Sequence, residues 1–472
     1  MQDVDLLRRE IWGAGISHPD PKVRSHFVQR YPTFESFDSW SLKEFLGFNP
    51  DRPVLGLDAI PDLGPSPTVG TALSQGARHP DDDRRNQERF AHDGDRRVRL
   101  DPHGNPFPAD PVQLDMGPLR GTASQAYAHY GLPKIPFSDD PDVLRREPRR
   151  FAYPPTARAF AAEFAQMHSD LALCAATLGR SGGVTLGWLF LGNAHHYIED
   201  VANQIHTLQA IFEFFVDAKI ESYKEELRSL GGLLRSRPTF VSIGVDIIKN
   251  HHLLAEELFA KRVREHVAGK WSHPGVEEAL GAILQGDSAL EQALDARKLD
   301  VDGPFARYIA EEVIDASSRE GAEVYRLIRR LAQRRFSRLV GRFETGMDPD
   351  EALVPKPDQA TLAQFYRLQG AGFARAGSAL RRHVSLYSAA LELARASDEV
   401  RHDLFKRTAE RLVSNQVAWL KESAERLARF QPRPPRKNDT NWWVSMGLCI
   451  MLLSVDGMLV LFFRWRVRKY RT

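Results

Sequence analysis

The chain has 472 residues, enough for a large core or for two or three domains. Lysine and arginine together number 64 against 62 aspartates and glutamates, so no global field favours nucleic acid, and such a partner would need a local basic patch. The two cysteines, Cys174 and Cys449, argue against a disulfide framework and cannot supply a thiolate zinc site, which leaves the 16 histidines and the carboxylates as metal ligands.

The N-terminal third of the chain is expected to form loops and short helices, with few regular elements in its Pro-rich part beyond residue 95. Residues 1–5 are acidic and no apolar run follows, so no secretory signal is expected. His18 stands before a proline, and a charged stretch further on holds Asp81 and His92. Taken alone, these features are typical of a turn residue and a solvated loop.

The middle of the chain turns strongly helical, with one helix expected from near Thr185 through Phe215. This helix places His196 and Asp200 on one face, and His206 follows roughly two to three turns later. Imidazoles and carboxylates are costly to bury within apolar sequence unless something binds them. One His-Asp pair alone is more typical of a polar stripe, but a helix with all these groups can supply ligands to more than one metal ion.

A second helix, expected over residues 246–267, repeats the pattern. His252 and Glu256 stand four residues apart, so both side chains can reach one ion from one face of the helix. Alone, this pair would more often be a surface contact. Together with the other clusters of histidine and acid, it favours metal binding.

From about residue 275 to 430 the chain is expected to be almost wholly amphipathic helix, with turns at Gly303-Pro304 and around residues 347–357. Arg and Glu alternate there with apolar residues, which is interpreted as the solvated faces of packed helices. The sequence contains no Gly-rich phosphate loop between a strand and a helix. An all-α fold is therefore predicted.

The C-terminal residues combine a basic, Pro-rich linker at 431–441 with an apolar segment at 442–463 and a basic tail at 464–472. The apolar segment is long enough to cross a hydrocarbon core of roughly 30 Å, and tryptophans stand at both of its ends, as in interfacial belts. A single transmembrane helix is predicted here. Asp456 within it is expected to mark a helix–helix contact, through which the chain would form oligomers.

The predicted localisation is the membrane, with a single pass through this helix. Charge does not decide which side the body faces, because five basic residues lie on each side of the span. The missing secretory signal favours a cytoplasmic body, whereas the chemistry predicted below is usually an export chemistry.

The clustered histidines and acids resemble, in order and type, the zinc-dependent phospholipase C family, which shares an all-helical fold with the secreted single-strand nucleases. The resemblance covers roughly residues 10 to 260, and its most specific motif is His-Tyr-x-x-Asp-x-x-x-x-x-His. The resembling stretches are Trp12-Gly-Ala-Gly-Ile-Ser-His18, Gly76-Ala-Arg-His-Pro-Asp81 leading to Phe90-Ala-His92, His196-Tyr-Ile-Glu-Asp200 with His206, and His252-Leu-Leu-Ala-Glu256.

The resemblance implies a cluster of two or three zinc ions. The first ion would be held by Asp81, His92, His196 and Asp200, the second by His206, His252 and Glu256, and the third by His18, with Asp200 bridging it to the first. Asp81 would also help to position or deprotonate the attacking water. Clustered dications bind phosphate oxygens and lower the pKa of a water towards 7, so that no protein nucleophile is needed.

This sequence departs from the family pattern in two places. The family's third zinc is also held by the amino group of an N-terminal Trp, whereas the matching Trp12 is internal, and the usual Gln-Pro before the third ligand of the central motif is Gln204-Ile205. The sequence also leaves rival ligands open. These are Asp217 and Glu221 for the second ion, and His195 with Glu199 on the central helix.

The leading functional prediction is a membrane-anchored phosphodiesterase of phospholipase C type, with a catalytic domain at 1–270 and a helical extension at 271–430. It would act on a phospholipid membrane and release small phosphorylated headgroups. One alternative is a nuclease or nucleotidase on the same metal cluster, with a basic groove from the arginines near His92. The other is a non-catalytic membrane protein that binds one zinc ion in a degenerate site.

Overall fold

A computed structural model describes residues 2–37, 68–78, 129–131, 161–179, 181–208, 240–337 and 347–430. Every regular element in these ranges is a helix, apart from one isolated bridge between Ala332 and Leu353. The prediction of an all-α fold is confirmed. The helices are α1 (Gln2–Ile16), α2 (Pro21–Arg30), α4 (Val69–Arg78), α9 (Ala161–Thr177), α10 (Ser181–Ala202), η4 (Gln204–Thr207), α12 (Phe240–Val267), α13 (Pro274–Gln285), α14 (Ser288–Ala296), α15 (Phe305–Leu331), α16 (Arg334–Ser337), η5 (Pro349–Ala352), α17 (Gln359–Ala394) and α18 (Asp398–Phe430).

The chain divides into two compact units, Met1–Leu427 and Ala428–Thr472. Residues on both sides of the expected domain boundary at residue 270 belong to the first unit. The predicted transmembrane segment at 442–463 lies outside the described residues, as do the linker and the tail that flank it. Among the helices that are described, none combines the length and the apolar character needed to cross a bilayer.

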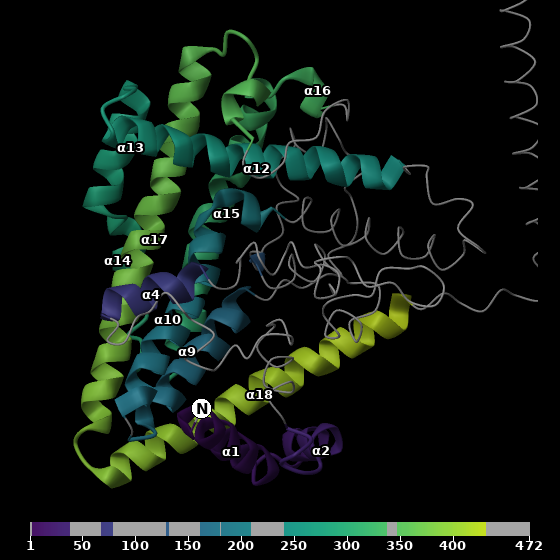
Figure 1. Cartoon of the computed structure of the whole chain (residues 1–472), viewed down its shortest axis with the longest axis vertical. Coiled ribbons are helices and arrows are strands. Elements are labelled where there is room, and N and C mark those ends of the chain that lie inside the picture. The colour runs from purple at the N-terminus through teal and green to yellow at the C-terminus, as the bar shows by residue number, and fades with distance from the viewer. Residues whose placement is uncertain are drawn as a thin grey trace, which may run out of the picture. The chain divides into compact units, whose positions relative to one another are not determined.

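Helices α9 and α10 form the centre of the first unit, and α10 packs against α9, α4, α15 and α17 (Figure 1). Fifteen of the 17 residues of α9 are buried, the polar Gln166, His168 and Asp170 among them, so the helix lies in the core on nearly all sides. The buried carboxylate of Asp170 lies within α9 and pairs with Arg411 of α18 at 2.6 Å. This ion pair joins α18 to the central helices.

Two glycines allow α4 to lie directly on α10. A Cβ atom added to Gly192 of α10 would lie 2.3 Å from the Leu73 carbonyl oxygen and 2.8 Å from the Cα atom of Gly76 in α4. Only a residue without a side chain fits at such a contact between two backbones. The close approach brings the C-terminal turn of α4, with its free carbonyl groups, to the side of α10.

Helix α10 ends at Ala202, so the expectation of one helix continuing through Phe215 is wrong at this point. The side-chain oxygen of Asn203 accepts a hydrogen bond from the Ile205 amide at 3.3 Å and caps the short 3₁₀ helix η4. Side chains of this kind compete with a continuing helix by bonding to nearby backbone groups. The break gives His206 an orientation that regular helical spacing does not predict.

Helices α15 and α17, which follow the expected domain boundary at residue 270, pack against the end of α10 and the start of η4. Gly321 of α15 lies against the Gln204 carbonyl, and Gly372 of α17 lies against the Ala202 carbonyl, so that a Cβ atom at either glycine would come within 2.7 or 2.8 Å of the oxygen. The buried Gln204 side chain also donates to the Leu368 carbonyl at 2.5 Å. Helices α15 and α17 therefore support the turn that carries His206.

Candidate metal centre

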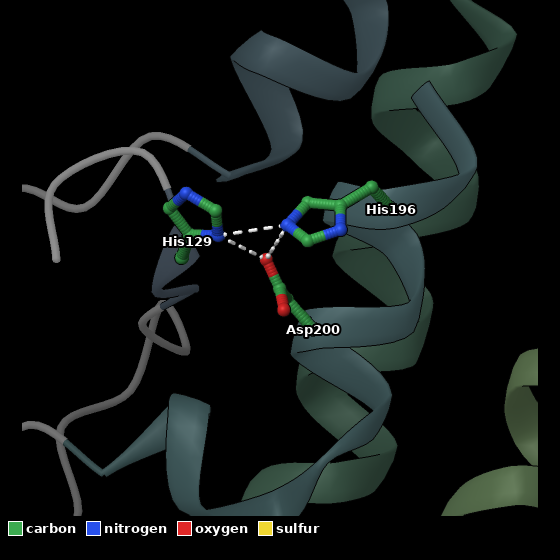
Figure 2. A group of neighbouring side chains, drawn as sticks. All are labelled: His129, His196 and Asp200. Carbon is green, nitrogen blue, oxygen red and sulfur yellow. Dashed lines mark hydrogen bonds and ion pairs between the residues drawn. The ribbon is translucent and has the colours of Figure 1, made fainter. Parts of the chain in front are cut away.

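The first group of potential ligands consists of His129, His196 and Asp200, whose side chains face one another (Figure 2). Asp200 Oδ2 lies 2.6 Å from His129 Nδ1 and 3.2 Å from His196 Nε2, and the two ring nitrogens are 3.0 Å apart. The three side chains are only 8–12% exposed. We call this set the first group.

The second group consists of His206, His252 and Glu256. His206 Nε2 lies 2.7 Å from His252 Nε2 and 3.4 Å from Glu256 Oε1, and His252 Nε2 lies 3.0 Å from the same oxygen. His206 comes from η4, while His252 and Glu256 stand one turn apart on α12. The Glu256 side chain is 40% exposed, so this group is the more open of the two.

Backbone carbonyls fix the tautomers of two of the imidazoles. His196 Nδ1 lies 2.9 Å from the Ala77 carbonyl oxygen at the end of α4, and His206 Nδ1 lies 3.0 Å from the His129 carbonyl oxygen. A carbonyl oxygen only accepts, so each Nδ1 carries the proton and donates it. In the neutral rings the Nε2 atoms therefore carry the lone pairs and face the groups. Such outer partners are typical of metal-binding histidines.

Side chains of neighbouring residues hold the second group in a similar way. Asn203 Nδ2 donates to Glu256 Oε1 at 3.0 Å, while its oxygen caps η4, so one amide positions both the carboxylate and the turn that carries His206. The Tyr130 ring stacks on the His206 ring, with the centroids 4.9 Å apart and the planes inclined by 17°. The His129 carbonyl at its edge and the Tyr130 ring on its face thus fix the orientation of the His206 ring.

Both groups fit a divalent metal ion. Pairs of ring nitrogens 2.7 and 3.0 Å apart repel each other through their lone pairs unless a proton or a metal cation lies between them. Separations of 2.6–3.4 Å within each group resemble the distance of about 3.3 Å that tetrahedral zinc imposes on ligands bonded at 2.0–2.1 Å. Two imidazoles and one carboxylate are also a ligand set of known catalytic zinc sites.

Electrostatics adapt the same residues to a cation. Burial alone would raise the pKa of Asp200, but the charges of His196 and His129 and their hydrogen bonds hold this pKa well below its ordinary value. Burial would lower the pKa of His206, but the hydrogen bond to Glu256 and the charges of Asp200 and Glu256 outweigh it and raise the pKa to about 9. The first effect keeps the Asp200 carboxylate negatively charged, and the second shows that the acids around His206 favour positive charge there.

The two groups adjoin each other at Asp200. Its Oδ2 atom belongs to the first group, and its Oδ1 atom lies 3.8 Å from His206 Nδ1 in the second. Asp200 is therefore a member of the first group and, through Oδ1, a neighbour of the outer edge of a His206 ring whose Nε2 faces the second group.

The structure brings together five of the residues that the sequence predicts as ligands. His196 and Asp200 meet in the first group, and the three ligands predicted for the second ion meet in the second group. Asp81 and His92 lie outside the described residues. His18 is not part of either group: its Nδ1 accepts from the Asp20 amide at 3.1 Å, and its Nε2 lies 2.9 Å from Ser414 Oγ in α18.

Sequence reasoning missed His129. It has no partner at helical spacing, and it stands in a stretch expected to be irregular. One signal was available, because Tyr127-Ala128-His129-Tyr130 is a cluster of aromatic residues within sequence rich in Pro, Asp and Gly. A lone aromatic cluster in such a stretch favours burial against a neighbouring core.

Two of the rival ligands, His195 and Glu199, lie within the described residues and belong to neither group. The ring of His195 lies 5.1 Å from that of His383 in the core, and burial lowers the pKa of His195 to about 4. Glu199 is exposed beside Asp200 and belongs to neither group, and Asp217 and Glu221 lie outside the described residues.

Comparison of the chain with protein-family models, with curated proteins and with solved structures gives no match. What can be stated of the described residues is therefore an all-helical protein with two buried groups of His, Asp and Glu that could hold metal ions. The resemblance to phospholipase C carries over only as a proposal.

Proposed function

We propose that the protein is a metal-dependent phosphodiester hydrolase of phospholipase C type that works with two ions. The observation that carries this proposal is the adjacency of two groups, each with two imidazoles and one carboxylate, which come within 3.8 Å of each other at Asp200 and His206. Paired metal sites of this composition are found in enzymes that hydrolyse phosphate esters, where two ions stabilise the attacking and the leaving oxygen. Zinc is the metal proposed, because hydrolysis needs no redox change.

Bound zinc would supply a water of lowered pKa and positive charge for the phosphate oxygens. The residues of the chain hold the ligand atoms in place. The Ala77 and His129 carbonyls keep the Nε2 atoms of His196 and His206 directed into the groups, and Asn203 holds the Glu256 carboxylate. The exposure of Glu256 favours the second group as the side from which a phosphodiester would enter.

Two elements of the sequence prediction remain proposals of their own. Asp81 and His92 would complete the first site and Asp81 would assist the attacking water, while a third ion would need His18 in a different environment from the one seen at α18. The apolar segment at 442–463 would hold the body close to its lipid substrate as a membrane anchor.

The test uses the full chain, first stripped with a chelator and then reloaded with zinc, on mixed phospholipid vesicles. The expected result is release of a phosphorylated headgroup together with diacylglycerol. His196→Ala removes a ligand of the first group and should reduce the rate to background. His26→Ala is the matched control, because His26 is exposed on α2 outside both groups and should leave the rate unchanged.

Three results would contradict the proposal in different ways. Intact vesicles beside rapid cleavage of single-stranded DNA would keep the metal centre but change the substrate class. Purified protein that contains iron rather than zinc would point to oxidative chemistry, since two histidines and one carboxylate also hold iron in oxygenases. Equal rates for His196→Ala and His26→Ala would remove the metal groups from the chemistry.

A further inference from the structure

Residue 129 takes part in both metal groups through different atoms. Its side-chain Nδ1 belongs to the first group, 2.6 Å from Asp200 Oδ2. Its main-chain carbonyl accepts the hydrogen bond from His206 Nδ1 at 3.0 Å, which fixes a ligand of the second group. The position of one residue therefore affects the geometry of both sites.

The two residues that follow His129 strengthen this connection. The Tyr130 ring stacks on His206, and the Gly131 amide donates to the His206 carbonyl at 3.1 Å. Residues 129–131 thus contact the edge of the His206 ring, its face and its main chain. A shift of His129 carries all three contacts with it.

An ion in the first group would pin the His129 side chain by a coordinate bond. The conformational cost of placing residues 129–131 would then already be met when a second ion arrives, and a site that is already ordered binds more tightly. Repulsion between two dications opposes this effect. The carboxylates of Asp200 in the first group and Glu256 in the second offset part of that repulsion with their negative charges.

We propose that residue 129 couples the two metal groups, so that each ion binds more tightly when the other is present. The inference rests on the metal-binding part of the proposed function and is independent of which phosphodiester is cleaved. Because coupling of binding is reciprocal, the gain in affinity is the same whichever ion binds first.

The coupling can be measured by titrating the metal-stripped full chain with Co²⁺ and recording visible absorption. His252→Ala leaves the first group alone, and His129→Gln leaves the second group alone. The overall constant for two ions in the unaltered chain is then compared with the product of the two single-site constants. The expected ratio is at least about fivefold, within the usual range of about 5–150-fold for coupled sites. A ratio of one or less overturns the proposal.

Two further variants separate coupling from simple loss of affinity. Tyr130→Ala removes the ring that stacks on His206 and should reduce the ratio. Asn203→Ala removes the amide that donates to Glu256 and caps η4, and it removes none of the contacts that residues 129–131 make with His206. It should weaken the second ion about 10–100-fold, as loss of outer partners usually does, and leave the ratio unchanged. The reverse pattern contradicts the proposal.

The outcomes keep the two proposals apart. If His129→Gln does not fold, as judged by circular dichroism, His196→Gln replaces it as the variant that leaves the second group alone, and the ratio is formed in the same way. A chain that binds no Co²⁺ contradicts the proposed function as well. A chain that binds two ions independently contradicts only the coupling.

Discussion

Replacing Gly192 by alanine tests how the contact between α4 and α10 supports the first metal group. The added methyl would lie 2.3 Å from the Leu73 carbonyl oxygen, and the atoms it meets belong to the backbone and cannot rotate away. Overpacking of this kind costs about 1–3 kcal/mol, while alanine returns about 1 kcal/mol of helix propensity. We expect a net loss of up to about 2 kcal/mol in the free energy of unfolding. We also expect a weaker first ion, because α4 must move and take the Ala77 carbonyl away from His196.

Gly281 in α13 provides the matched control, because a Cβ atom added there has nothing within 4 Å. Gly281→Ala should stabilise the protein by about 0.5–1 kcal/mol through helix propensity alone. Both variants are compared by urea unfolding of the metal-free protein and by Co²⁺ titration. The reasoning is refuted if Gly192→Ala is as stable as Gly281→Ala and binds its first ion as tightly as the unaltered chain.

Three further predictions follow from other parts of the structure. Arg411→Met leaves the buried Asp170 carboxylate without its guanidinium partner and should lower the free energy of unfolding in urea by about 3–5 kcal/mol. Adding Asp170→Asn to the same chain should restore most of this loss, and a double variant that is equally unstable contradicts this account. Burial and the neighbouring His195 hold the pKa of His383 well below 6.5, so the unfolded chain alone binds this proton as the pH falls below 6.5. Stability should therefore drop there, and His383→Gln should reduce the slope by about 1.4 kcal/mol per pH unit, whereas an unchanged slope argues against a buried neutral imidazole. Chelation of metal held at about 1,000 times its Kd should lower the free energy of unfolding by about 4 kcal/mol for each occupied group in thermal scans of the unaltered chain. His196→Ala should lose the share of the first group and keep that of the second, and an undiminished loss in this variant contradicts the account.

Local spacing was enough to find most of the second group. His252 and Glu256 share a helix face because they are four residues apart, and the same rule pairs His196 with Asp200. Spacing along one helix could not predict which segments far apart in the chain would meet. The separation of 46 positions between His206 and His252 made this pairing uncertain, and it depends on the path of η4 against α12.

The remaining differences come from local competition and from long-range contacts. Asn203 ends α10 because its side chain bonds to the backbone ahead, and a hydrophobic pattern that continued beyond it concealed that break. His129 contacts Asp200 although the two residues are 71 positions apart, and no acid or histidine at helical spacing from His129 indicated a site there. His18 was paired with the metal groups by resemblance alone, whereas both nitrogens of its ring already have protein partners.

The hydrogen bond between the end of α4 and His196 gives this chain a means of tuning metal chemistry from a distance. An imidazole that donates a stronger bond through Nδ1 becomes a better electron donor at Nε2, and so makes the ion it binds a milder Lewis acid. The helix that supplies the acceptor carries no ligand in its described residues. Substitutions along α4 therefore offer a route to altered reactivity in which every coordinating side chain is retained.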